Sequence, residues 1–275
     1  MNRGNGTFAH STVTGGNAPS ALAIADFNGD GHPDLALANN SYNDQGTTVG
    51  VLFGTGTGTF GPEATYTVGQ GVFGIAAADL DGDGHVDLAV GQATGAENAY
   101  HVVVLRNTGT GAFAVRGDVS IPGISERWPI EPVVAAADVN GDGRIDLVAG
   151  AKLDDQVAVL VNQGHGAFTQ SLLQASFGAV GLIATDLDGD GHPDIMQAAP
   201  FGGTQSTGEL AFLHGVGDST FAPAVFINQG AQPNDVAAAD FNGDGRLDLA
   251  VPNESSGTGS IEPQLASGQF ATAPV

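Results

Sequence analysis

"ADFNGDGHPDL" stands at residues 25–35 and places oxygen-bearing side chains at positions 1, 3, 5 and 9 of a short loop: Asp26, Asn28, Asp30 and Asp34. The stretch returns four times, as "ADLDGDGHVDL" (78–88), "ADVNGDGRIDL" (137–147), "TDLDGDGHPDI" (185–195) and "ADFNGDGRLDL" (239–249). The first aspartates of the five copies are 53, 59, 48 and 54 residues apart. Self-similarity at such a period is typical of repeat architectures, so the repeat decides the fold prediction.

Each repeat contains four short apolar segments. One precedes the acidic loop, one follows it, and a third ends in a glycine-rich turn and a phenylalanine, as in "VVVLRNTGTGAF" (102–113), before the fourth begins. No segment has a helical period, and the chain has 43 glycines, which disfavour helices. Four short strands per repeat are typical of a propeller blade. The sequence therefore predicts one all-β domain over residues 1–275, a five-bladed β-propeller of four-stranded antiparallel blades.

The two ends of the chain predict how the ring closes. Residues 7–14 ("TFAHSTVT") match the fourth strand of a blade, while the last repeat keeps only "ATAPV" (271–275) for its own fourth strand. We expect the N-terminal strand to complete the last blade and remove an exposed sheet edge. The alternative is an excerpt of a longer array, for example one of seven blades. The phenylalanines after the glycine-rich turns are expected to wedge between blades: Phe8, Phe60, Phe113, Phe168, Phe221 and Phe270.

Charge and hydropathy exclude several classes of partner. The chain has 7 Lys and Arg against 30 Asp and Glu, a formal net charge of −23, which excludes nucleic-acid binding and docking on anionic membranes. No apolar run reaches the 18 residues or so of a membrane span. Residues 1–6 hold no apolar signal-peptide core, so we expect either a trimmed mature domain or a segment excised for expression. The chain has no cysteine, so thiolate metal sites are excluded.

The acidic loops predict metal sites. Side-chain oxygens at positions 1, 3, 5 and 9, with a main-chain carbonyl at position 7, form the ligand pattern of a calcium loop. The loops differ from an EF-hand, since no helices flank them and Leu37 stands at position 12 of the first copy. The alternative is a metal-free turn in which aspartates cap backbone amides.

We expect calcium because three or four carboxylates on one turn repel one another without a cation, and the loops hold 17 of the 30 acidic residues. The sequence predicts up to five Ca²⁺ ions, in loops 26–34, 79–87, 138–146, 186–194 and 240–248. The expected side-chain ligands are Asp26, Asn28, Asp30, Asp34, Asp79, Asp81, Asp83, Asp87, Asp138, Asn140, Asp142, Asp146, Asp186, Asp188, Asp190, Asp194, Asp240, Asn242, Asp244 and Asp248. The expected main-chain carbonyl ligands are those of His32, His85, Arg144, His192 and Arg246.

The run D-x-[DN]-G-D-G-x-x-D-[LI] between two short apolar strands resembles the FG-GAP/VCBS repeats of integrin α-subunit propellers and many extracellular bacterial proteins. The resemblance covers essentially the whole chain. It implies that each loop joins the innermost strand to the second on the lower face, that calcium is a structural ion, and that the protein is extracellular or on the cell surface. Family propellers commonly have seven blades, so five is a departure. Family functions include adhesion, carbohydrate binding and accessory roles on enzymes, so the resemblance does not identify a ligand.

The variable loops of the upper face are the expected place for a ligand. They carry Tyr42, Glu97, Tyr100, Arg127 and Trp128, and aromatic rings beside polar groups can stack on a sugar. The alternative is that Trp128 plugs the channel or packs on a neighbouring blade. We therefore expect a monomeric, calcium-stabilised, lectin-like adhesion module for a glycan or an extracellular protein.

The sequence leaves two alternative functions. One is a purely structural display module. The other is a polysaccharide-active enzyme domain, which would need a facing pair of carboxylates. The predicted innermost strands offer one ionisable residue before the acidic loops, Asp235, so we expect no catalytic residues.

Overall fold

The computed structural model describes residues 12–40, 47–94, 99–121, 131–151, 154–202, 208–229, 232–265 and 268–270, and these form five antiparallel sheets. The first sheet contains β1 (Pro19–Ala25), β2 (Asp34–Asn39), β3 (Thr48–Leu52) and β4 (Ala64–Thr67). The second contains β5 (Val72–Ala78), β6 (Asp87–Thr94), β7 (Ala99–Asn107) and β8 (Phe113–Ile121). The third contains β9 (Pro132–Ala137), β10 (Asp146–Ala151), β11 (Gln156–Asn162) and β12 (Phe168–Gln174). The fourth contains β13 (Gly181–Thr185), β14 (Asp194–Ala199), β15 (Glu209–Leu213) and β16 (Val225–Asn228), and the fifth contains β17 (Ala237–Ala239), β18 (Asp248–Asn253) and β19 (Thr258–Glu262).

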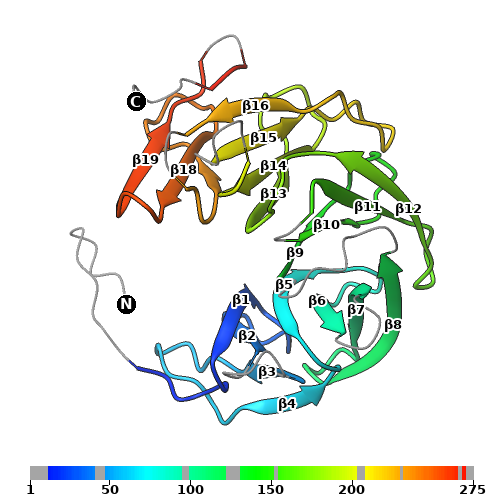
Figure 1. Cartoon of the computed structure of the whole chain (residues 1–275). Helices are drawn as coiled ribbons and strands as arrows, with labels where there is room; N and C mark the ends of the chain where they lie inside the picture. Colours follow the sequence, from blue (N-terminus) through cyan, green and yellow to red (C-terminus); the bar gives the residue numbers. More distant parts are fainter. Residues whose placement is uncertain are drawn as a thin grey trace.

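The sheets follow one another along an arc, with β1, β5, β9 and β13 on its inner side (Figure 1). Strands β4, β8, β12 and β16 lie on the outer side, so each sheet is one blade. The predicted five-bladed β-propeller is confirmed. In the described part of the chain the fifth blade has three strands. Of the predicted closing strand 7–14, only residues 12–14 are described and they form no strand, while the rest lies outside the described residues.

The second strands of the first four blades are almost wholly buried, which explains their composition, while β18 of the fifth blade is partly exposed. Every residue of β10 and β14 is buried. After its acidic loop β10 continues as an unbroken apolar or small-residue run, which in β14 only Gln197 interrupts. The outer strands β4, β12 and β16 are largely exposed or half-buried. β4 and β12 carry several polar side chains, whereas β16 exposes the apolar Val225 and Phe226. A continuous apolar run therefore marks a strand covered by blades on either side. None of the described residues forms a helix long and apolar enough to cross a membrane.

The hydrophobic core consists of four clusters, each between two consecutive blades. Between the first two blades, the rings of Phe27 and Phe113 meet edge to face with centroids 5.6 Å apart. Between the last two, Phe270 meets Phe212 at 6.2 Å. Phe113 and Phe270 thus occupy the expected position between blades. Since each blade packs mainly on its neighbours, the interfaces between blades hold the fold together.

The two ends of the arc expose apolar side chains that are buried at the other interfaces. Phe27, at loop position 2 of the first blade, is 2% exposed, whereas Phe241, at the same position of the fifth blade, is 52% exposed. On the first blade, Leu22 and Ile24 of β1 are also exposed. The described residues therefore leave the face of the fifth blade and the inner strand of the first blade without a covering blade.

Candidate metal centres

The five acidic loops share one backbone conformation, which their aspartate and glycine positions explain. In loop 26–34, the Asp26 carboxylate accepts hydrogen bonds from the backbone N–H of Gly29 at 2.8 Å, Asp30 at 3.1 Å and Gly31 at 2.8 Å. Gly29 and Gly31 have φ of 75° and 83°, a region that side chains disfavour, which is why glycine recurs at these two positions. Each loop joins the first strand of its blade to the second, so all five loops lie on the same face of the propeller.

The aspartate at position 9 is buried and ties each loop to the end of the third strand of its blade. Asp34 is 0% exposed, and its carboxylate accepts the backbone N–H of Phe27 at 2.8 Å and of Gly54 at 2.7 Å. The other four blades repeat this pair of bonds with Asp87, Asp146, Asp194 and Asp248.

Burial makes negative charge at position 9 costly. Desolvation, the largest cause, raises the pKa of Asp87 to about 6. Amide hydrogen bonds from Asn107 and Leu80 oppose this rise, and the charges of Asp81 and Asp83 add to it. Burial likewise raises the pKa values of Asp146 and Asp194. A cation among these carboxylates would favour their ionised form.

The side chains fit a hard divalent cation. Asp79, Asp81 and Asp87 offer carboxylate oxygens that lie within 4.8 Å of one another, and loop 186–194 offers a similar group. The hydrogen bonds from backbone amides to the aspartates would also hold a metal-free turn. The capping that the metal-free alternative requires is therefore present. Capping does not explain why a buried carboxylate such as Asp87 and its more exposed neighbours gather at one point. An all-oxygen donor set of carboxylates, amides and carbonyls suits Ca²⁺.

Two loops carry a fourth carboxylate at position 3, and each meets a basic side chain of its own blade. In loop 79–87, Arg106 Nε lies 2.5 Å from Asp81 Oδ2 and its second terminal nitrogen 2.8 Å from Asp83 Oδ2. The hydrogen bond from Arg106 holds the pKa of Asp83 below its usual value. In loop 186–194, His214 Nδ1 lies 3.0 Å from Asp188 Oδ2.

Arginines at position 7 add side-chain contacts that the sequence analysis did not predict. The Arg144 guanidinium turns back to pair with Asp142 at 2.5 Å, and its Nε donates to the Asn162 carbonyl at 2.9 Å. Arg246 pairs with Asp244 in the same way. In both loops the side chain at position 7 thus partly neutralises the aspartate at position 5.

A buried amide links consecutive blades close to these loops, and the sequence analysis missed it. Asn162, the last residue of β11, donates through Nδ2 to the Leu80 carbonyl of the preceding blade at 2.7 Å and to the Ile145 carbonyl of its own loop at 2.9 Å. Asn107 makes the same two bonds one blade earlier, and Gln264 reaches the Leu187 carbonyl.

The first and fourth blades have glycine instead of this amide. A Cβ at Gly54 would lie 2.2 Å from the Pro33 carbonyl oxygen, and one at Gly215 would lie 2.1 Å from that of Pro193. Proline at loop position 8 therefore accompanies glycine at the strand end. The sequence shows which blades have proline at loop position 8 and glycine at the end of the third strand. That difference was the available signal for which blades lack the buried amide.

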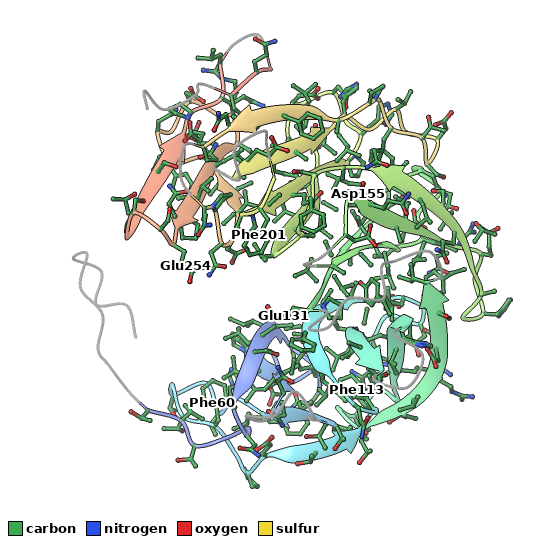
Figure 2. All side chains as sticks on the ribbon, in the orientation of Figure 1. Phe60, Phe113, Glu131, Asp155, Phe201 and Glu254 are labelled. Atoms are coloured by element: carbon green, nitrogen blue, oxygen red, sulfur yellow. The ribbon has the colours of Figure 1, made fainter. Side chains whose placement is uncertain are left out.

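The opposite face of the propeller holds a hollow of about 490 Å³ at the starts of the inner strands. Its lining includes Ser20, Gly74, Glu131, Gly181 and Asp235. Figure 2 shows Glu131 on the inner side of the arc. Partial enclosure raises the pKa of Asp235. The sequence analysis identified Asp235 as an inner ionisable group and missed Glu131, which precedes its strand.

The structure changes the predicted ligand residues. Tyr100 is 0% exposed, and its hydroxyl donates to the Val133 carbonyl at 3.2 Å, so its expected stacking on a ligand is wrong. The Tyr100 ring, whose hydroxyl has this one partner, is therefore part of the interface between the second and third blades. The other four predicted residues, Tyr42, Glu97, Arg127 and Trp128, lie outside the described residues.

A five-bladed propeller with an acidic loop after each inner strand defines a repeat-built β-propeller of the kind that the sequence motif predicted. The model of the FG-GAP-like repeat matches residues 1–37, 26–90, 93–149, 138–196 and 201–251. The chain therefore belongs to the FG-GAP-like repeat family.

Several curated relatives are integrins. Human integrin alpha-IIb is 39% identical over 101 residues, which cover 29% of this chain and 10% of the integrin. Integrin alpha-PS2 of Drosophila melanogaster is 28% identical over 164 residues, which cover 52% of this chain and 11% of the integrin. The chain thus spans about a tenth of the length of these relatives.

A solved structure of an Agrocybe aegerita lectin, whose subject is recognition of non-reducing terminal N-acetylglucosamine, covers 93% of this chain and 79% of its own. Its sequence identity to this chain is 19% and the TM-score is 0.44.

Proposed function

We propose that this propeller is a non-catalytic, extracellular binding or adhesion module that calcium ions stabilise. The observation that carries the proposal is the burial of the position 9 aspartates among other carboxylates in loops of one conformation. Five such loops on one face would give a rigid base. The ions would be held by carboxylate and amide oxygens at positions 1, 3, 5 and 9, with Asp34 as an example of the last.

Membership of the FG-GAP-like repeat family, together with relatives named as integrin alpha chains, supports a role in binding outside the cell. We place the ligand, a glycan or an extracellular protein, on the face opposite the acidic loops. There the hollow combines two carboxylates, Glu131 and Asp235, with the small residues Ser20, Gly74 and Gly181. Polar groups that converge in a concavity are typical of small-ligand sites.

Removal of metal tests the calcium proposal. A ligand that binds only the folded state stabilises it by RT ln(1 + [L]/Kd), about 2.7 kcal/mol per site at a free concentration 100 times Kd. We expect excess chelator to lower the melting temperature by many degrees, and excess Ca²⁺ to restore it. Equal melting temperatures with chelator and with millimolar Ca²⁺ would show that the loops are not structural metal sites.

A glycan array with the calcium-loaded protein tests the ligand proposal. A glycan hit that weakens in the double variant Glu131→Gln/Asp235→Asn would support binding at the hollow. The control is Asp155→Asn, an exposed aspartate outside the hollow lining (Figure 2). Absence of binding across glycans and matrix proteins would favour a structural display module instead.

A further inference from the structure

The five acidic loops are not equivalent, because the side chain just before the end of the third strand differs between blades. In the second blade, Leu105 pairs with Leu88 across the sheet, so Arg106 lies opposite Asp87, where the loop enters β6. In the first blade, Leu52 pairs with Leu35, so the same place is taken by the apolar Phe53. The register of β6 with β7 therefore places the charged side chain of Arg106 beside loop 79–87.

The Arg106 guanidinium bridges two carboxylates that are expected metal ligands. Its Nε meets Asp81 at 2.5 Å and its terminal nitrogen meets Asp83 at 2.8 Å, through the Oδ2 atom in each case. Asp81 at position 3 and Asp83 at position 5 thus each contact the Arg106 guanidinium through one carboxylate oxygen. The guanidinium is planar and permanently charged, and it has no hydrogen-bond acceptor of its own. The Oδ1 atoms of the two carboxylates accept the backbone N–H of Asp83 at 3.2 Å and of His85 at 3.0 Å, so a metal ion would compete with the guanidinium for the Oδ2 atoms.

The repeat itself supports this pairing. Asp81 is the additional carboxylate at position 3, where the first, third and fifth loops have asparagine. Those three blades have the uncharged Phe53, Val161 and Pro263 at the place of Arg106. In the third and fifth loops the arginine at position 7 pairs with the aspartate at position 5 only, so no basic side chain of the described residues contacts position 3 there. The added negative charge and its basic partner therefore occur together.

We propose that the Arg106 guanidinium is the resident cation of loop 79–87, so that this loop binds calcium much more weakly than loop 26–34. This inference rests on the proposed calcium binding of the other loops. It deepens that proposal by making one of the five sites self-occupied. In the fourth blade the corresponding His214 differs, since a neutral imidazole can itself coordinate a metal.

Arg106→Gln tests the proposal, with Arg116→Gln as the matched control. A second hollow, of about 400 Å³, lies beside loop 79–87 and is lined by both Arg106 and Arg116. Arg116→Gln removes the same charge as Arg106→Gln, but Arg116 takes part in none of the ion pairs of the described residues. Native mass spectrometry counts bound Ca²⁺ at fixed free concentrations. The expected result is one ion more for Arg106→Gln than for wild type and for Arg116→Gln, with a gain of about tenfold or more in affinity at one site, since ligand charge tunes such loops over decades.

The outcomes separate this inference from calcium binding itself. If wild type and Arg106→Gln bind the same number of ions with the same affinities, the inference is overturned and the calcium proposal stands. If neither wild type nor Arg106→Gln binds calcium, this inference and the calcium proposal are both overturned, because removal of the guanidinium has then opened no site. Melting curves in chelator show whether each variant is folded, and a third of the Arg106 side chain is exposed, so glutamine fits without a cavity.

Discussion

Asn162 joins two blades through one buried amide, and its truncation to alanine measures what that link contributes. Its Nδ2 donates to Leu80 at 2.7 Å and Ile145 at 2.9 Å, and its Oδ1 accepts the Gly164 N–H at 2.9 Å. Asn162→Ala removes three hydrogen bonds and leaves two carbonyl oxygens without this donor in a fully buried place. At about 1 kcal/mol per bond, the free energy of unfolding should fall by about 3 kcal/mol, and the melting temperature by about 6–12 °C.

The assay is urea unfolding followed by far-ultraviolet circular dichroism in excess chelator, so that metal does not contribute. The control is Gln163→Ala, the next residue, whose exposed amide makes only bonds of 3.2 Å and 3.3 Å. Its effect should stay within about 0.5 kcal/mol. A loss below about 1 kcal/mol for Asn162→Ala, or one equal to that of the control, would refute a stabilising link between the blades.

Three further predictions concern packing within and between blades. Gly54→Ala should cost about 2 kcal/mol or more, because its Cβ would lie 2.2 Å from a carbonyl oxygen, whereas Gly61→Ala, with 3.8 Å of space, should cost under about 1 kcal/mol in urea unfolding. Phe27→Ala should cost about 3–5 kcal/mol and the exposed Phe241→Ala under about 1 kcal/mol; equal losses would show that Phe241 is covered in solution. Tyr100→Phe should lower stability by about 1 kcal/mol and leave any glycan binding unchanged, and a change in binding instead would place this ring in the ligand site.

The repeat made the fold predictable. Aspartates such as Asp26 and Asp34 recur at fixed spacing, and glycines such as Gly29 and Gly31 recur where φ must be positive. These are local requirements of a loop between two strands, so they are written in adjacent residues. The alternation of short apolar runs then predicted the strands around each loop.

The contacts between blades were not predictable in the same way. Asn162 and Leu80 are 82 residues apart in the sequence, and only the stacking of the second and third blades brings them together. Tyr100 failed as a ligand residue for the same reason, because the neighbouring blade covers its ring and receives its hydroxyl. A residue in one repeat carries no local mark of what the next repeat places against it.

By itself, the sequence determined the number of repeats, the strand-loop-strand unit and the residues of the acidic loops, because these depend on backbone conformation and burial within one repeat. Only the tertiary structure decided that Arg106 reaches Asp81 and Asp83, and that Glu131 and Asp235 share a hollow. The first depends on the register of β6 with β7, and the second on the packing of inner strands around the arc. Both follow from the relative placement of strands, which residue spacing in the chain does not specify.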